Sequence, residues 1–226
     1  MKFTFYGHAT FLIEVDGTKI LFDPFITPNE KAAHIDISTI EADYILISHA
    51  HGDHIADAVA LAKQTGATCV ANFEIATWLG NQGVEKAHPM NHGGKWKFDF
   101  GTVKMVNAIH SSSFPDGSYG GHPAGFIIKT PSINLYYSGD TALMQEMKFW
   151  GRKHSLDLAI LPVGDNFTMG YEDAVIAAKR LKVDTVVGVH FDTFPYIEID
   201  HAAATKAFAD KDKELLLLGI GDTVEI

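Results

Sequence analysis

Short apolar runs recur along the whole chain and are bounded by glycine, proline, aspartate or asparagine. The first three runs predict an opening meander of strands, with a hairpin turn at Asp16-Gly17. A fully apolar run at 44–47 is typical of a strand buried on both faces. The expected strands lie at 3–6, 10–15, 19–22, 44–47, 68–71, 103–109, 124–129, 133–137, 158–161, 185–189, 215–218 and 223–226.

Helical patterns alternate with these strands. The expected helices lie at 55–64, 73–79, 141–150, 171–181 and 202–210. The first of them stops at Gly66, and Asp53 occupies a position that favours an N-cap. Strands mixed with helices throughout predict a layered α/β arrangement in which helices cover sheets. With no linker, low-complexity segment or short repeat, residues 1–226 are expected to form a single domain.

Polar side chains that can bind metals follow the apolar strands at their ends. The pattern recurs at Asp23, His49, His110, Asp140 and His190. Strand ends in packed α/β proteins converge on one edge, where sites are usually assembled. Five such ends predict a site at this edge.

The densest group of these side chains is the segment 49–54, His-Ala-His-Gly-Asp-His. Its alanine and glycine let the backbone fold tightly enough to aim several side chains at one point. Imidazole and carboxylate groups suit zinc and similar divalent metals, at ~2.0–2.2 Å for zinc. A lone His-x-His is better explained as a solvated loop, but this spacing directly after a buried strand indicates a metal site.

These residues resemble the signature of the metallo-β-lactamase superfamily. The segment 49–54 carries the first motif, and His110, Asp140 and His190 follow in the order of that family. More locally, the chain resembles a branch of small, mostly uncharacterised metal-dependent hydrolases related to ascorbate-6-phosphate lactonase and N-acylphosphatidylethanolamine phospholipase D. The segments that carry this resemblance are 7–8, 23–24, 107–112, 123–126, 138–141, 164–170 and 190–195.

The resemblance implies an α/β fold, the αβ/βα four-layer sandwich of the metallo-β-lactamase fold, with two mixed sheets flanked by helices. It also implies two metal ions at one edge of the sandwich. The first ion would be held by His49, His51 and His110, the second by Asp53, His54 and His190, and Asp140 would bridge both. Asp23 matches a position that orients the ligands from behind.

The ligand types bear on the metal and its chemistry. The related flavodiiron proteins, which are redox enzymes, carry a glutamate where this chain has His51. The histidine-rich set therefore favours Zn²⁺, with Mn²⁺ or Fe as alternatives. Two such ions would produce a bridging hydroxide near neutral pH and polarise the substrate oxygen. Asp53 or Asp140 would then accept or pass on a proton.

Four residues are candidates for roles beside the metals. His8 is expected to donate to substrate or act as an acid, with a structural turn histidine as an equal alternative. Asn166 and Thr168, on a loop at a strand end, are candidate substrate contacts, with loop capping as the alternative. His122 is expected to face the site after a Gly-rich segment at 114–121, which has the composition of a substrate lid or an ordinary connecting loop.

Composition narrows the partners. The formal net charge of −10 disfavours a non-specific nucleic-acid binder, because such a chain repels phosphate backbones at long range. The single cysteine, Cys69, leaves no partner for an intramolecular disulfide and is expected in the core. The sequence shows neither a signal-peptide core nor an apolar stretch of ~20 residues, so a cytoplasmic protein without membrane insertion is expected. A homo-oligomer stays open.

The sequence thus predicts an enzyme, a binuclear metal-dependent hydrolase of a small-molecule, ester-like substrate, with lactones and phosphodiesters as the first classes. Two alternatives stay open. A nuclease or RNA-processing phosphodiesterase carries the same signature, although the chain lacks a basic arm. A non-catalytic metal-binding sensor would keep the ligands without turnover. The substrate itself is not predicted, because specificity lies in loops that vary on one fold.

Overall fold

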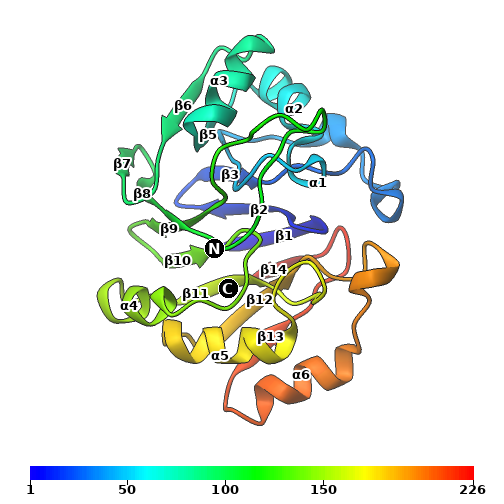
Figure 1. Ribbon diagram of the computed structural model, residues 1–226, viewed down its shortest axis with the longest axis vertical. Helices are drawn as coiled ribbons and strands as arrows, with labels where there is room; N and C mark the ends of the chain where they lie inside the picture. Colours follow the sequence, from blue (N-terminus) through cyan, green and yellow to red (C-terminus); the bar gives the residue numbers. More distant parts are fainter.

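Two seven-stranded sheets pack face to face in the computed structural model, which describes residues 1–226. Helices cover the outer face of each sheet, with α1–α3 on one side and α4–α6 on the other (Figure 1). This is the predicted αβ/βα sandwich with two mixed sheets, and the prediction is confirmed. None of the helices combines the length and the apolar composition needed to cross a bilayer.

The first sheet has an antiparallel and a parallel half. Strands β1–β3 form the predicted meander, and β3–β6 run parallel. Parallel neighbours need crossover connections, which contain the helices α2 (Ala58–Thr65) and α3 (Phe73–Asn81). In spatial order the strands are β14 (Thr223–Glu225), β1 (Lys2–Gly7), β2 (Thr10–Val15), β3 (Thr18–Phe22), β4 (Tyr44–Leu46), β5 (Thr68–Asn72) and β6 (Ala87–Met90).

The second sheet repeats this plan. Strands β7–β10 are antiparallel and β10–β13 are parallel. Its helices are α4 (Glu146–Lys153), α5 (Tyr171–Leu181) and α6 (His201–Ala209). In spatial order the strands are β13 (Glu214–Leu216), β12 (Thr185–Val189), β11 (Leu158–Pro162), β10 (Asn134–Tyr137), β9 (Ala124–Lys129), β8 (Gly101–Asn107) and β7 (Lys95–Phe98).

Aromatic side chains join the two sheets. The Phe11 ring stacks on Phe22 and Phe3, with centroids 4.4 and 4.9 Å apart. Tyr137, from β10 of the other sheet, meets the Phe11 ring edge-on at 5.0 Å. All four side chains are fully buried. Burial of aromatic area on this scale dominates core energetics and holds the sheets at a fixed separation.

A smaller apolar cluster fills the space beneath α2 and α3. Ile45 and Cys69 from the first sheet pack there with Leu61 and Ile75 from the helices. Burial raises the pKa of the Cys69 thiol to about 12. The prediction that Cys69 is a core residue is confirmed.

Two predicted helices begin elsewhere, in both cases beside the site edge. The helix expected at 55–64 is two helices, α1 (Gly52–Ile55) and α2, and Asp53 lies inside the first turn of α1 rather than at its N-cap. The Asp53 carboxylate accepts a hydrogen bond from His8 instead of capping its own backbone. The helix expected at 141–150 starts at Glu146, because the Thr141 hydroxyl accepts from the Ile109 backbone N–H in the connecting loop.

Strands β6 and β7 were not predicted. Residues 95–98 of β7 form an exposed edge strand whose side chains give little burial pattern. The 3-10 helices η1 (Glu30–Ala32), η2 (Ile37–Thr39) and η3 (Pro195–Ile197) were also not predicted, because three-residue helices carry no apolar periodicity.

The aromatic junction between the sheets should dominate stability. We expect Phe11→Ala to lower the free energy of unfolding by about 3–5 kcal/mol, because it opens a cavity between Phe3, Phe22 and Tyr137. Urea denaturation followed by circular dichroism measures this loss. Phe149→Ala, on the exposed face of α4, is the matched control and should change the free energy by about 0.5 kcal/mol or less. Equal effects in the two variants would contradict the assignment.

Candidate metal centre

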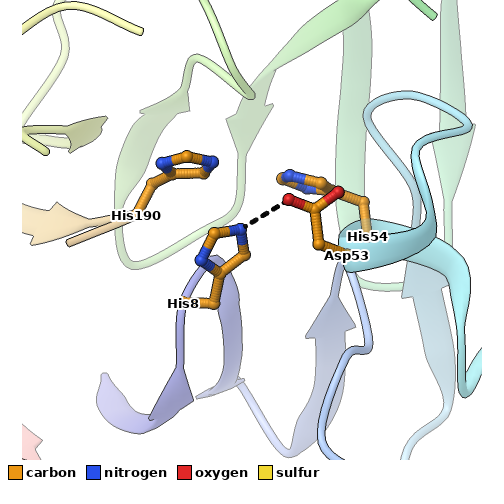
Figure 2. A group of neighbouring side chains, drawn as sticks. All are labelled: His8, Asp53, His54 and His190. Atoms are coloured by element: carbon orange, nitrogen blue, oxygen red, sulfur yellow. Dashed lines mark hydrogen bonds and ion pairs between the residues drawn. The ribbon is translucent and has the colours of Figure 1, made fainter. Parts of the chain in front are cut away.

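Strand ends from both sheets bring the predicted ligands together at one edge. His49, His51 and His110 form one group whose ligand atoms lie within 4.8 Å of one another. A second group of the same compactness consists of His8, Asp53, His54 and His190. Figure 2 shows the second group converging from three separate segments, with His8 pointing at Asp53. The groups match the two predicted ligand sets, with His8 added to the second.

The Asp140 carboxylate lies between the two groups. Its Oδ2 atom is 3.0 Å from His190 Nε2 and 3.3 Å from His54 Nε2. The same oxygen is 3.6 Å from His110 Nε2 and 4.0 Å from His49 Nε2. One oxygen therefore faces imidazoles of both groups, which is the placement expected of a shared ligand.

The first group has the nitrogen spacing of a metal site. His49 Nε2 and His51 Nδ1 are 3.0 Å apart, close to the roughly 3.3 Å between two nitrogens bound tetrahedrally to one zinc ion. His51 Nε2 lies 3.3 Å from Ser111 Oγ. If Nε2–H donates to this hydroxyl, the Nδ1 lone pair faces His49 and is free to bind a metal.

The first group is also in the right protonation state. Burial holds the pKa of His49 well below its usual value, and it lowers the pKa of His51 and His110 as well. These rings are therefore neutral near pH 7. Neutral imidazole is the form that binds a metal.

The two carboxylates are ionised, although removal from water alone would raise the pKa of each. Burial alone would raise the pKa of Asp140, but His190 and His54 outweigh it and hold that pKa well below the usual range. The pKa of Asp53 is lowered in the same way by His54 and His8 against the effect of burial. The site thus holds two ionised carboxylates, of which Asp140 is buried and Asp53 is partly exposed.

The two carboxylates oppose the effect of burial on His54. Burial favours its neutral form, but Asp140 and Asp53 outweigh burial and raise the pKa of His54 well above its usual value. His54 Nε2 is buried and makes no well-aligned hydrogen bond, although Asp140 Oδ2 lies 3.3 Å away, and His190 Nδ1 is buried without a hydrogen-bond partner. A divalent cation in place of the Nε2 proton of His54 would be stabilised by the same two carboxylates, so the residues present fit the predicted metals.

A fully buried carboxylate, Asp23, supports the ligands from behind. It accepts hydrogen bonds from the Ser48 backbone N–H at 2.7 Å and the Ser48 hydroxyl at 2.5 Å. His54 Nδ1 donates at 2.9 Å and the Tyr137 hydroxyl at 2.6 Å. Burial, together with the nearby carboxylates, raises the pKa of Tyr137 well above its usual value, so its hydroxyl stays a donor.

This network fixes the ring tautomers of one ligand in each group. The Ser48 hydroxyl gives its proton to Asp23, so it accepts from His49 Nδ1 at 3.0 Å. His54 donates its Nδ1 proton to Asp23 directly. In both rings Nε2 is left to face the site, which is how partners behind a metal ligand set its orientation.

His8 lies behind Asp53. Its Nε2 atom is 3.0 Å from Asp53 Oδ2, and its Nδ1 atom is 3.0 Å from the Thr193 hydroxyl. Burial and the neighbouring His190 lower the pKa of His8 to about 3. A neutral ring facing an ionised carboxylate must carry its proton on Nε2, so His8 donates to Asp53 and accepts from Thr193.

Three site residues have left-handed backbone at strand ends. The φ angles are +56° at His8, +40° at Asp23 and +56° at His190. The His8 carbonyl accepts the His190 backbone N–H at 2.6 Å. Non-glycine residues enter this region at a cost of roughly 1–2 kcal/mol each. The chain carries this strain where it aims side chains into the site.

A cavity of about 520 Å³ opens onto the ligands. Its lining residues are His51, Asp53, His110, Ser111, Asp140, Phe167, His190, Phe194, Pro195 and Tyr196. The predicted substrate contacts Asn166, Thr168 and His122 do not belong to this lining, although Phe167 lies between the first two. Their contact with substrate stays a prediction.

The loop before His122 is held against α3. Phe114 is buried and stacks on Trp78 at 5.1 Å. Asn72 Nδ2 donates to the carbonyls of Gly120 and His122 at 2.8 and 3.1 Å. These contacts favour an ordinary connecting loop over a lid, and the His122 side chain is exposed.

Residues behind the ligands were not found from the sequence. Ser48 and Tyr137 lie in or beside apolar strands, so the sequence pattern predicts core residues there. Ser111 and Thr193 lie in segments that the pattern predicts to be loops. A weak signal existed, because Ser48 and Ser111 each neighbour a predicted ligand. Tyr137 had none, since its partner Asp23 lies 114 positions away.

Comparisons with known proteins agree with this geometry. Residues 2–190 match a family described as "Beta-lactamase superfamily domain". A protein of Flavobacterium johnsoniae named "UPF0173 metal-dependent hydrolase" is 57% identical over 226 residues, which is 100% of both chains. A protein of the same name from Methylacidiphilum infernorum is 49% identical over 224 residues, 99% of each chain.

A solved structure shares both fold and sequence. It is Igni18, described as a novel metallo hydrolase from the hyperthermophilic archaeon Ignicoccus hospitalis. The TM-score is 0.88 at 34% identity, and the match covers 99% of this chain and 97% of the other.

The Asp23 network should control metal affinity. We expect Asp23→Asn to weaken zinc binding by about 10- to 100-fold. The NH₂ group of asparagine would face side chains that are themselves hydrogen-bond donors. The hydrogen bonds that orient the His49 and His54 rings would therefore be lost. Competition with a chromogenic chelator measures the affinity.

Asp57→Asn is the matched control for this experiment. Asp57 is also a buried carboxylate that accepts backbone hydrogen bonds, from Ile26 at 2.6 Å and Thr27 at 2.9 Å. These hydrogen bonds involve none of the ligand rings, so the zinc affinity of Asp57→Asn should equal that of the unmodified protein. Equal losses in both variants would contradict the assigned role of Asp23.

Proposed function

The chain belongs to the metallo-β-lactamase superfamily and is a metal-dependent hydrolase, and we propose that it uses two divalent ions to hydrolyse an ester-like bond of a small molecule. Lactones and phosphodiesters are the first substrate classes. One observation carries the proposal of two ions. Asp140 Oδ2 faces imidazoles of two separate ligand groups at 3.0–4.0 Å.

The donor set supports zinc as the metal. We propose that His49, His51 and His110 hold one ion, that Asp53, His54 and His190 hold the other, and that Asp140 is shared. When bound, two such ions supply Lewis acidity, which makes a water acidic near neutral pH and polarises the substrate oxygen. Imidazole-rich sets suit zinc, and Mn²⁺ or Fe remain alternatives.

Exposure separates the roles of the two carboxylates. The side chain of Asp53 is 28% exposed and that of Asp140 is 3% exposed. Both line the cavity, but Asp53 is open to its contents. We therefore propose that Asp53 takes a proton from the attacking water or passes one to the leaving group, whereas Asp140 serves as a ligand.

His8 acts through Asp53 in this proposal. Its side chain is fully buried and does not line the cavity, so contact with substrate is not supported. The donor bond from His8 Nε2 stabilises the ionised form of Asp53 and fixes its orientation. His8 is therefore a positioning residue.

A nuclease function is not supported by the site. The cavity lining contains no lysine or arginine. A nucleic-acid strand is normally held by such cations along its phosphates. A small-molecule substrate agrees better with this lining.

Loss of a single ligand should abolish the activity. Purified protein should contain about two ions per chain by plasma mass spectrometry, as in two-metal hydrolases. We expect His51→Ala and Asp140→Ala to reduce the metal content and to lower hydrolysis of lactones and phosphodiesters below detection. His88→Ala, a histidine on β6 whose ring lies against Trp96, should change neither. Full activity in both ligand variants, or in chelated protein, would refute the proposal.

Removal of the His8 donor should shift the pH profile. The hydrogen bond from His8 lowers the pKa of Asp53, so His8→Leu should raise that pKa and move the acidic limb of kcat/KM to higher pH. His8→Gln keeps a side-chain N–H and should restore the profile in part. Both replacements keep a Cβ at a position with φ of +56°, so any cost from the left-handed backbone is shared by the two variants. Identical profiles in both would contradict a positioning role.

A further inference from the structure

An aromatic wall borders the cavity that opens onto the ligands. It consists of Phe167, Phe194, Pro195 and Tyr196. Tyr196 is 74% exposed and Phe167 is 50% exposed, and their rings meet edge-on with centroids 6.2 Å apart. Large apolar side chains left in water and gathered beside a cavity are typical of a ligand site.

The wall is preformed by two short loops. Phe167 belongs to the loop after β11, where its backbone N–H donates to the Asp165 carbonyl at 2.6 Å. Phe194 and Tyr196 belong to the loop after β12, which Ile197 closes by donating to the Phe194 carbonyl at 3.0 Å. The loops lie in contact, since a Cβ at Gly164 would be 2.1 Å from the His190 carbonyl oxygen.

Phe194 connects the wall to the site beneath it. Its half-buried ring lies 5.4 Å from the His8 ring and 6.5 Å from that of Phe25. The Asp53 carboxylate accepts from His8 and also lines the cavity. A group that rests on the wall is therefore next to the residues that we assign to the reaction.

The wall offers nothing to a charged group. The charged carboxylates of the lining, Asp53 and Asp140, lie among the ligands, and no lysine or arginine is present. Lys31 and His201 contact the second wall loop, but Lys31 Nζ donates to the Asp192 carbonyl and the His201 ring bonds the Asp192 carboxylate. An anionic group on the wall would lose its hydration without gaining a cation.

We propose that the aromatic wall binds an apolar alkyl or aryl group beside the scissile bond, so that the substrate is a neutral ester or lactone carrying such a group rather than a phosphodiester. This assignment rests on the proposed hydrolytic function of the same site. Each methylene that becomes fully buried contributes ~0.8 kcal/mol, a factor of about 4 in affinity.

The wall can be tested by binding as well as by turnover. Butyrate, hexanoate and octanoate, titrated by calorimetry into zinc-loaded protein, share one carboxylate and differ in tail length. We expect each added pair of methylenes to raise the affinity by up to about 15-fold. Affinity that is independent of tail length, or tighter binding of the dicarboxylate adipate than of hexanoate, would overturn the proposal.

Variants of the wall sharpen the experiment. Phe167→Ala and Tyr196→Ala should weaken octanoate more than butyrate, so that the dependence on tail length flattens. Phe149→Ala removes a phenylalanine of similar exposure (57%) from α4 and should leave every affinity unchanged. A uniform loss for all three tails in the wall variants would contradict apolar recognition.

Turnover separates this inference from the function on which it rests. We expect kcat/KM for p-nitrophenyl acetate, butyrate and octanoate to rise in that order and to exceed the value for bis(p-nitrophenyl) phosphate. Hydrolysis that favours the phosphate would overturn the inference and leave the hydrolase intact. If no substrate is hydrolysed but binding still depends on tail length, the proposed ester-hydrolysing function is refuted and the apolar binding role of the wall is supported.

Discussion

The Asp23 carboxylate holds this site together. It is fully buried, and its acceptor capacity is taken up by Ser48 and His54 from its own sheet side and by Tyr137 from the opposite sheet. A carboxyl group buried this deeply is tolerated only when donors satisfy its oxygens. The same bonds set the tautomers of rings in both ligand groups. One residue thus couples the packing of the two sheets to the aim of the ligands.

The rest of the architecture serves this arrangement. The aromatic contacts of Phe11 with Phe22 and Tyr137 fix the sheets against each other, and Tyr137 also donates to Asp23. Parallel strands of both sheets end at one edge, and this places ligands from distant parts of the chain close to one another. Core packing and ligand orientation are therefore not independent properties of this molecule.

The strands and the cluster at 49–54 could be predicted because their signals are local, whereas the division of the ligands into two groups came from the family resemblance. Apolar runs such as 185–189 and the spacing within 49–54 are visible in a few residues. Helix starts beside the site were misplaced, since Asp53 and Thr141 bond to residues from other segments. The aromatic wall escaped notice for the same reason. Phe167 and Tyr196 look like unremarkable loop residues until two loops bring them together.

The left-handed backbone at His8, Asp23 and His190 has an evolutionary consequence. Glycine at any of these positions would relieve the strain, yet it would remove a side chain on which the site depends. Selection for a more stable scaffold and selection for the reaction therefore pull in opposite directions at the same three codons. Copies of this chain that are no longer selected for the reaction would be expected to lose these three side chains early, while the two-sheet fold persists.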